Sequence, residues 1–526
     1  MRKRLVAAFF SFAVCACIML CAGKPAQASS QYYDGKLEIS GFAKETVFYR
    51  TSWEPGEAGD HDSRVDLALA SFYFESIYKI TDSPDMNITW FNGLRYWWEQ
   101  SSYFDDRAND ILAHNDRARY EHPTHGEELL TESYLSFTKG PWDVRVGKQI
   151  IIWGQLDTSR VADVVNPLDL RRGVPGVDNW EEIKQGLWMI NTTYRSTLPG
   201  NLIFQNIINP GYYKNLLLPY EGTHWGPGHA KNAFGPTIDS PGIYHWQQQK
   251  WNADAPTGWD ADNWELGFRV QGYTYDIDWS LLYWNARSDG PTARVHNATK
   301  YGTNYAFPAA VLATITGSDT VHAKYWDGGK AFSFKRFQTF GGTAQTVIEP
   351  LHDSVWRLEW FFEKDSPFNT GVKGSNSSLT GVTRQDILGT AMSYSDKYNI
   401  PWFTPTIGTG KFFELTLTYF IEHVFNMNSD IVINDRNHRQ GDPNAQSLSL
   451  FMMQQMFNAS WTFTFNSSYY PMIKKWFIVP CFTYTWPGEH WRTDIGAALY
   501  GGSNNEYVGD GYAHKDSILF RMRYEF

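Results

Sequence analysis

The chain has 526 residues and a formal net charge of −10, from 56 acidic and 46 basic residues, a surplus of acid that argues against a nucleic-acid partner. The mean hydropathy is −0.43, yet aromatic residues make up 17% of the chain, including 23 Trp and 30 Tyr. A polar average with abundant Trp and Tyr is typical of a transmembrane β-barrel, whose outer face meets lipid and whose inner face meets water. A secreted, carbohydrate-binding β-protein is the alternative.

The N-terminus carries an export signal. MRKR is followed by an apolar core and by the small-residue site Ala26-Gln27-Ala28, so residues 1–28 are predicted to be a secretory signal peptide. A lipoprotein signal at Cys21 is the alternative. Removing the signal takes away four basic residues and no acids, so the mature net charge is −14. Only Cys481 remains, which excludes an intramolecular disulfide. The mature chain, residues 29–526, is predicted to be a single barrel domain.

Segments with a two-residue rhythm recur along the whole mature chain. They predict an all-β, antiparallel transmembrane barrel of about 18 strands, with 16 as the alternative. Short turns such as 139–142 and 274–276 are expected in the periplasm and the long connections outside. The predicted strands lie near 36–50, 64–80, 85–100, 128–138, 143–153, 182–195, 201–209, 263–273, 276–287, 336–348, 354–364, 381–396, 410–424, 446–457, 460–470, 475–486, 490–501 and 514–526.

Charged residues occupy one face of several of these strands. In WELGFRVQGY, residues 264–273, Leu266 and Phe268 fall on one face, with Glu265 and Arg269 opposite. Aligned charges would be very costly in a dry sandwich core, but they suit a water-filled lumen. On this basis seven side chains are predicted to face the lumen: Arg145, Gln149, Glu265, Arg269, Glu414, Arg521 and Arg523. A barrel of this size encloses more space than side chains fill, so a channel or a plugged lumen is expected.

The most specific stretch is VRVGKQIIIWGQLDTSRVADVVNPLDLRRG, residues 144–173. It resembles Gram-negative porins, in which a Gly-Arg/Lys-Gln strand leads into a third extracellular loop folded back into the lumen. Still more similar is a large, functionally uncharacterised family of outer-membrane barrels that share GKQ, WG and VVNPLD. The resemblance implies a lumen-inserted loop over 154–181 and a charged constriction formed by Asp157, Arg160, Asp163, Asp169, Arg171 and Arg172. The alternative is an external loop with solvated charges.

Lys148 departs from the pattern of the porin motif. It shares the alternation phase of Val144, Val146 and Ile150, which directs it toward lipid. A bulge at Gly147 would turn it inward. Otherwise the side chain must extend along the barrel surface to reach water. The direction of Lys148 is therefore left open.

Two long external connections have unusual compositions. Segment 210–262 contains His224, His229 and His245 among several tryptophans, but their irregular spacing favours surface histidines over a metal site. Segment 308–317, PAAVLATITG, is apolar, and a docking surface, a plug and ordinary loop packing are all compatible with it.

The chain ends in ILFRMRYEF, which places Ile518, Phe520, Met522 and the terminal aromatics on one face and the arginines on the other. In the family that the chain resembles, the terminal aromatic-X-aromatic is part of the signal read by the barrel-assembly machinery. The resemblance therefore implies an assembly signal at Tyr524 and Phe526.

Together these features predict a channel for small solutes in the outer membrane of a Gram-negative bacterium. No Gly-X-Ser-X-Gly or His-Glu-X-X-His motif is present, so no enzyme activity, metal or cofactor is predicted. The expected partners are outer-membrane lipid, lipopolysaccharide, the barrel-assembly machinery and a small solute, with homo-oligomerisation left open. The alternatives are a transporter or export partner for hydrophobic or lipid-like molecules, an outer-membrane hydrolase, and a structural surface protein.

Overall fold

The computed structural model describes a large part of the mature chain. The described residues are 30–51, 65–83, 85–100, 122–123, 125–156, 158–169, 177, 180–213, 253–254, 258–289, 292–293, 332–351, 353–371, 379–398, 413–428, 431–432, 441–457, 459–502 and 516–526. The predicted signal peptide and segment 308–317 lie outside them.

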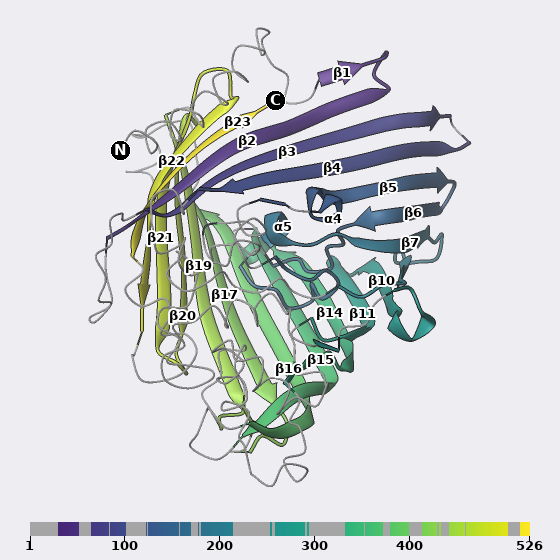
Figure 1. The fold of residues 1–526 in the computed structure, drawn as a ribbon, viewed down its shortest axis with the longest axis vertical. Helices are drawn as coiled ribbons and strands as arrows, with labels where there is room; N and C mark the ends of the chain where they lie inside the picture. The colour runs from purple at the N-terminus through teal and green to yellow at the C-terminus, as the bar shows by residue number, and fades with distance from the viewer. Residues whose placement is uncertain are drawn as a thin grey trace, which may run out of the picture.

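Eighteen antiparallel strands form the wall of a closed barrel, which confirms the predicted fold class and strand number (Figure 1). They are β2 (Leu37–Arg50), β3 (Val65–Asp82), β4 (Asn87–Glu99), β5 (Leu130–Lys139), β6 (Trp142–Gln149), β7 (Leu187–Arg195), β8 (Ile203–Asn209), β10 (Glu265–Thr274), β11 (Ile277–Arg287), β14 (Arg336–Ile348), β15 (Ser354–Gly371), β16 (Leu379–Tyr398), β17 (Phe413–Val424), β19 (Asn444–Met456), β20 (Trp461–Tyr470), β21 (Lys475–Thr485), β22 (Trp491–Gly501) and β23 (Ser517–Glu525).

Several short elements accompany the wall. β1 (Ser30–Tyr32) pairs with β2, and β18 (Ile431–Val432) pairs with β15. β9 (Ala253–Asp254), β12 (Thr292–Ala293) and β13 (Phe332–Ser333) form a small separate sheet. The helical turns are α4 (Gly126–Leu129), α5 (Trp180–Ile183), η2 (Ala261–Asn263) and η4 (Glu349–Leu351). In the described part of the chain no helix is long and apolar enough to cross a membrane.

The first and last wall strands close the barrel. β23 pairs with β2 from Glu525 opposite Phe42 to Ser517 opposite Arg50. Beyond the last pair, the backbone amide of Phe526 donates to Gly41 O at 3.0 Å, and the amide of Gly41 donates to Phe526 O at 2.9 Å. A Cβ at position 41 would lie 2.7 Å from Cζ of Phe526 and 2.3 Å from Tyr73 O. Gly41 therefore leaves the space in which the terminal ring sits.

The two faces of the wall differ in chemistry, as strand alternation requires. On β10, Leu266 and Phe268 are each 44% exposed on the outer face, while Glu265 and Arg269 are buried on the inner face. On β23, Ile518 and Phe520 are exposed and Leu519 is buried between them on the opposite face. The outer surface is therefore apolar and suits lipid, and the inner surface carries the charges.

Tight turns join neighbouring strands at one end of the barrel. β10 and β11 are linked by Tyr275 and Asp276, whose φ angles of 53° and 59° are both positive, as a type I′ hairpin turn requires. β5 and β6 are linked through Gly140, with φ 54°. The side of the membrane on which these turns lie stays a prediction.

Two of the predicted strands that flank the porin-like motif are too long. β6 ends at Gln149 rather than near residue 153, because the amide of Ile151 donates to the Asn166 side chain and not to a neighbouring strand. β7 begins at Leu187 rather than near residue 182, because residues 180–183 form α5.

The closure of the barrel predicts how the chain end affects assembly. Deleting Phe526 removes two backbone hydrogen bonds at the seam and the ring that stacks on Phe72 at 5.9 Å. We expect a severe loss of outer-membrane protein that migrates faster unheated than boiled on SDS gels. Glu525→Gln, one residue earlier on the inner face, is the control. Equal yields from the two variants would contradict the roles assigned to these residues.

Candidate functional site

Between β6 and β7, the described residues 150–156, 158–169, 177 and 180–186 lie along the inner face of the wall, and they are called the inserted segment. Asn166 ties its two ends together. The fully buried Asn166 side chain accepts a hydrogen bond from Ile151 N at 2.7 Å and donates to Gln149 O at 3.3 Å and Gln185 O at 2.7 Å. A single bridge, between Leu168 and Lys184, continues this contact. The Asn-Pro of the VVNPLD motif thus holds the two ends of the inserted segment next to each other.

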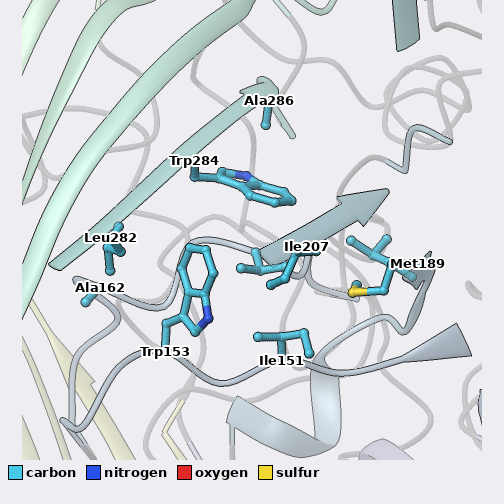
Figure 2. Close-up of a cluster of buried hydrophobic side chains, with 10 residues drawn as sticks. Ile151, Trp153, Ala162, Met189, Ile207, Leu282, Trp284 and Ala286 are labelled. Atoms are coloured by element: carbon cyan, nitrogen blue, oxygen red, sulfur yellow. The ribbon is translucent and has the colours of Figure 1, made fainter. Parts of the chain in front are cut away.

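Trp153 anchors the first part of the inserted segment against the wall. Its ring is fully buried and meets Trp284 of β11 edge to face, with ring centroids 6.0 Å apart (Figure 2). Its indole nitrogen donates to Oε1 of Gln205 on β8 at 2.9 Å. The surrounding apolar cluster comprises Ile151, Trp153, Ala162, Val165, Leu187, Met189, Ile207, Leu282, Trp284 and Ala286. The WG part of the motif therefore packs on the inner face of the wall.

A carboxylate of the wall holds the middle of the inserted segment. Glu359 lies on the inner face of β15, six strands along the wall from β6, and has no solvent exposure. It accepts hydrogen bonds from the amides of Gln155, of Leu156 at 3.0 Å and of Ala162 at 2.9 Å. Oγ1 of Thr158 donates to Oγ1 of Thr418 on β17 at 2.8 Å. The segment thus reaches strands far around the barrel from its origin.

A second carboxylate holds the last part of the inserted segment to another region of the wall. Glu182 in α5 accepts from Nζ of Lys44 on β2 at 2.5 Å and lies 3.6 Å from Nη1 of Arg523 on β23. Arg95 of β4 donates to the backbone carbonyl of Glu182. Burial acts to raise the pKa of the Glu182 carboxyl, but Lys44, Arg95 and Arg523 outweigh it and lower the pKa to about 2. Glu182 is therefore ionised at any physiological pH.

Three of the predicted constriction residues are described. Arg160 and Asp163 contact each other, with Nε 3.2 Å from Oδ2, and the Arg160 guanidinium also donates to Asp163 O at 2.7 Å and Asn166 O at 3.0 Å. Asp163 forms a second ion pair with Lys184 at 2.6 Å. The amide of Asp169 donates to Ile183 O at 2.7 Å. Asp157, Arg171 and Arg172 lie outside the described residues.

The side chains predicted to face the lumen lie on the inner face of the wall wherever their contacts are described. The Arg145 guanidinium lies over the ring of Tyr134 at 5.5 Å, and buried Gln149 donates to Met189 O at 3.1 Å. Glu265 accepts from Asn209 at 2.8 Å. Arg521 lies 3.6 Å from Asp494. Arg269, Glu414 and Arg523 occupy inner positions on β10, β17 and β23.

Lys148 lies on the outer side of the alternation. Gly147 has a φ of 139°, but the register runs through it without a shift, and Lys148 remains opposite Ser133 of β5 and Trp188 of β7. The side chain is nevertheless 5% exposed, because Nζ donates to Glu127 O at 2.7 Å and Oε2 at 3.2 Å in α4. The ammonium group is thus partnered by α4 at the edge of the wall.

A cavity of about 320 Å³ lies between the inserted segment and the inner face of β2, β3 and β4. Phe42, Leu69 and Trp97 contribute apolar surface. The charged side chains around it are Lys44, Arg95, Glu127, Glu128, Lys148, Asp169, Glu182 and Lys184. Both cations and carboxylates are therefore available to a bound molecule.

Sequence reasoning missed the two residues that position the inserted segment. Glu359 and Glu182 contact residues that are far away in the sequence. From the sequence alone, a strand carboxylate such as Glu359 would be interpreted as one more charge that faces the lumen. An available signal was the composition of β15, where Arg357, Glu359 and Glu363 share the inner face. The three predicted loop histidines, His224, His229 and His245, lie outside the described residues.

The chain matches the family described as "Protein of unknown function (DUF1302)" over residues 68–526. No curated protein matches it. Among solved structures, Acinetobacter baumannii OccAB3 is 9% identical with a TM-score of 0.47, covering 93% of this chain and 99% of that chain. A BenF-like porin from Pseudomonas fluorescens is 10% identical with a TM-score of 0.45, covering 93% and 98%.

Pseudomonas aeruginosa OccK2 (OpdF), solved in complex with glucuronate, is 8% identical with a TM-score of 0.45, covering 94% of this chain and 99% of that chain. The family match extends over most of the mature chain, from within β3 to the last residue. The protein therefore belongs to the DUF1302 family.

Proposed function

We propose that the protein is an outer-membrane channel through which small solutes pass a constriction formed by the inserted segment. The observation that carries this proposal is the pair of attachments of that segment, to Glu359 on β15 and through Glu182 to β2, β4 and β23. A segment fixed at separated parts of the wall narrows the lumen without relying on loop contacts outside the barrel.

The barrel wall supports this proposal. Eighteen strands enclose a lumen wider than side chains alone can fill, so a water-filled path beside the inserted segment is expected. The apolar outer face suits the lipid of a Gram-negative outer membrane, and we place the protein there. We assign it no covalent chemistry and no cofactor.

Charge at the constriction is the second part of the proposal. Asp157, Arg160, Asp163, Asp169, Arg171 and Arg172 lie between β6 and β7 in the sequence and would select solutes by charge. Arg160 and Asp163 are paired with each other, so much of their field cancels. We therefore assign the main anion-attracting role to Arg171 and Arg172.

Removing the Glu359 carboxylate should loosen the constriction. Glu359→Ala leaves the amides of Gln155, Leu156 and Ala162 without their acceptor, at a cost of about 1–3 kcal/mol for each unpaired group. We expect single-channel conductance in planar bilayers to rise and to fluctuate more, while the heat-modifiable barrel is retained.

The control is Glu414→Gln, which removes an inward carboxylate of β17 at the position paired with Lys397. It should leave the conductance fluctuations unchanged. A Glu359→Ala channel with the conductance and noise of the parent would contradict the role assigned to this carboxylate.

The charges of the constriction predict the ion selectivity. Replacing both Arg171 and Arg172 with Ala should shift the reversal potential under a salt gradient toward cation selectivity, because the acids of the segment remain. Charges on an external loop would be screened within about 8 Å at physiological salt and would have little effect.

The matched control removes two lysines at the other end of the barrel. Lys36 and Lys79 lie at the ends of β2 and β3, joined by a backbone hydrogen bond of 2.8 Å. Their replacement by Ala changes the net charge equally. If both double variants keep the parent's reversal potential, Arg171 and Arg172 do not line the path of the ions.

A further inference from the structure

Among the residues that the structure describes, the barrel wall is low next to β4. The ladder between β4 and β5 ends at the pair Leu94 and Leu130, whereas β4 continues to Glu99 alongside β3. Beyond β5, β6 has eight residues and β8 has seven, fewer than the roughly 9–11 residues that a spanning strand needs. Figure 1 shows β5, β6 and β7 as much shorter arrows than β3 and β4. The wall therefore steps down at the β4–β5 boundary.

Apolar and aromatic side chains cover the outer face of β4 at the step. On the outer face of β4, Leu94 is 42% exposed and Tyr96 is 46% exposed. Tyr96 is beyond the end of the β4–β5 ladder, so the outer face of the taller strand is still apolar above the step. A polar rim would be expected there if the step stood in water.

The cavity described above lies at this step. Lys44 and Arg95 reach it from the inner face, where they contact Glu182 and its backbone. Lys148 reaches it from the outer face, as its register opposite Trp188 requires, since the next outer residue on β7, Ile190, is 42% exposed. One cavity thus has lining residues from both faces of the sheet.

The turn α4 covers the outer side of this cavity. Glu127 accepts hydrogen bonds from Nζ of Lys148 and, at 3.2 Å, from the indole nitrogen of Trp188. These contacts attach α4 to β6 and β7 through one carboxylate. Figure 1 places α4 beside the start of β5, at the step in the wall.

We propose that this cavity is a lateral portal that takes amphiphiles with an anionic head group and an apolar body between the lumen and the membrane. The proposal deepens the function proposed above, because it uses the same lumen, and it names a substrate class for it. Opening α4 separates Glu127 from Lys148, and an anionic head group then replaces the carboxylate as partner of the ammonium group. Phe42, Leu69 and Trp97 receive the apolar body.

Because the head group would replace Glu127 as the partner of Lys148, substitutions at these two residues should have opposite effects on binding. Lys148→Met removes the partner of the head group and should weaken binding about tenfold or more, whereas Lys148→Arg should largely restore it. Glu127→Gln removes the competing carboxylate and should tighten binding several-fold. A purely structural role of the Lys148–Glu127 pair would weaken binding in both variants.

The probe is cis-parinarate, a fluorescent long-chain carboxylate, titrated onto the full mature protein in detergent, with its methyl ester as the uncharged control. Each variant is first shown to form the heat-modifiable barrel. The opposite effects of Lys148→Met and Glu127→Gln, seen with the acid and absent with the ester, support the portal. Equal affinity of parent and Lys148→Met, weakening by Glu127→Gln, or equal affinity for acid and ester would overturn it.

The route is tested in liposomes with the probe supplied in the lipid. Glu127→Gln should speed the arrival of the probe at its site, and an unchanged rate would overturn lateral access. Potassium chloride conductance is measured on the same preparations. If the parent protein binds the probe through Lys148 but conducts no ions, the channel proposal is wrong and the binding site is supported. If the parent protein conducts ions but Lys148→Met does not change its affinity for the probe, only the portal proposal is wrong.

Discussion

The carboxylate of Glu359 has no contact with solvent, and a buried carboxylate is costly unless hydrogen bonds compensate it. Three backbone amides of the inserted segment supply that compensation. Among its described residues the segment forms no ladder with a wall strand, so these amides are not paired as they would be in a sheet. The position of the segment and the burial of Glu359 therefore depend on each other, and neither arrangement is stable without the other.

The second attachment of the inserted segment, through Glu182, is stabilised by a different kind of interaction. Glu182 faces Lys44 and Arg523, so its stabilisation comes from charge rather than from backbone amides. Amide donors fix the direction of a carboxylate closely, while long cationic side chains tolerate small displacements. The β15 side thus sets where the inserted segment lies, and the α5 side limits how far it can move. In the proposed channel, these two attachments would hold the constriction in place while solutes pass.

The strands could be predicted from the sequence because each carries its own pattern. Leu266 and Phe268 alternate with Glu265 and Arg269 within a few residues, and alternation alone assigns their faces. The end of β6 could not be predicted in this way, because Ile150 to Trp153 continue the pattern and only Asn166, far along the chain, removes Ile151 from the sheet. Lys148 kept its predicted phase, but its partner Glu127 lies in a helical turn that no local pattern indicates. Contacts between distant residues determine the site.

The early end of β6 has two consequences that belong together. It ends the ladders of β6 with β5 and β7 at Lys148 and Gln149, and it releases the chain that contacts the inner face of the wall. Residues 150–156 cannot both extend β6 and reach Glu359, so the wall gives up height at β6 where the chain gains this contact with β15. The length of β6 and the contact of the inserted segment with β15 thus both depend on one hydrogen bond, from Ile151 to Asn166.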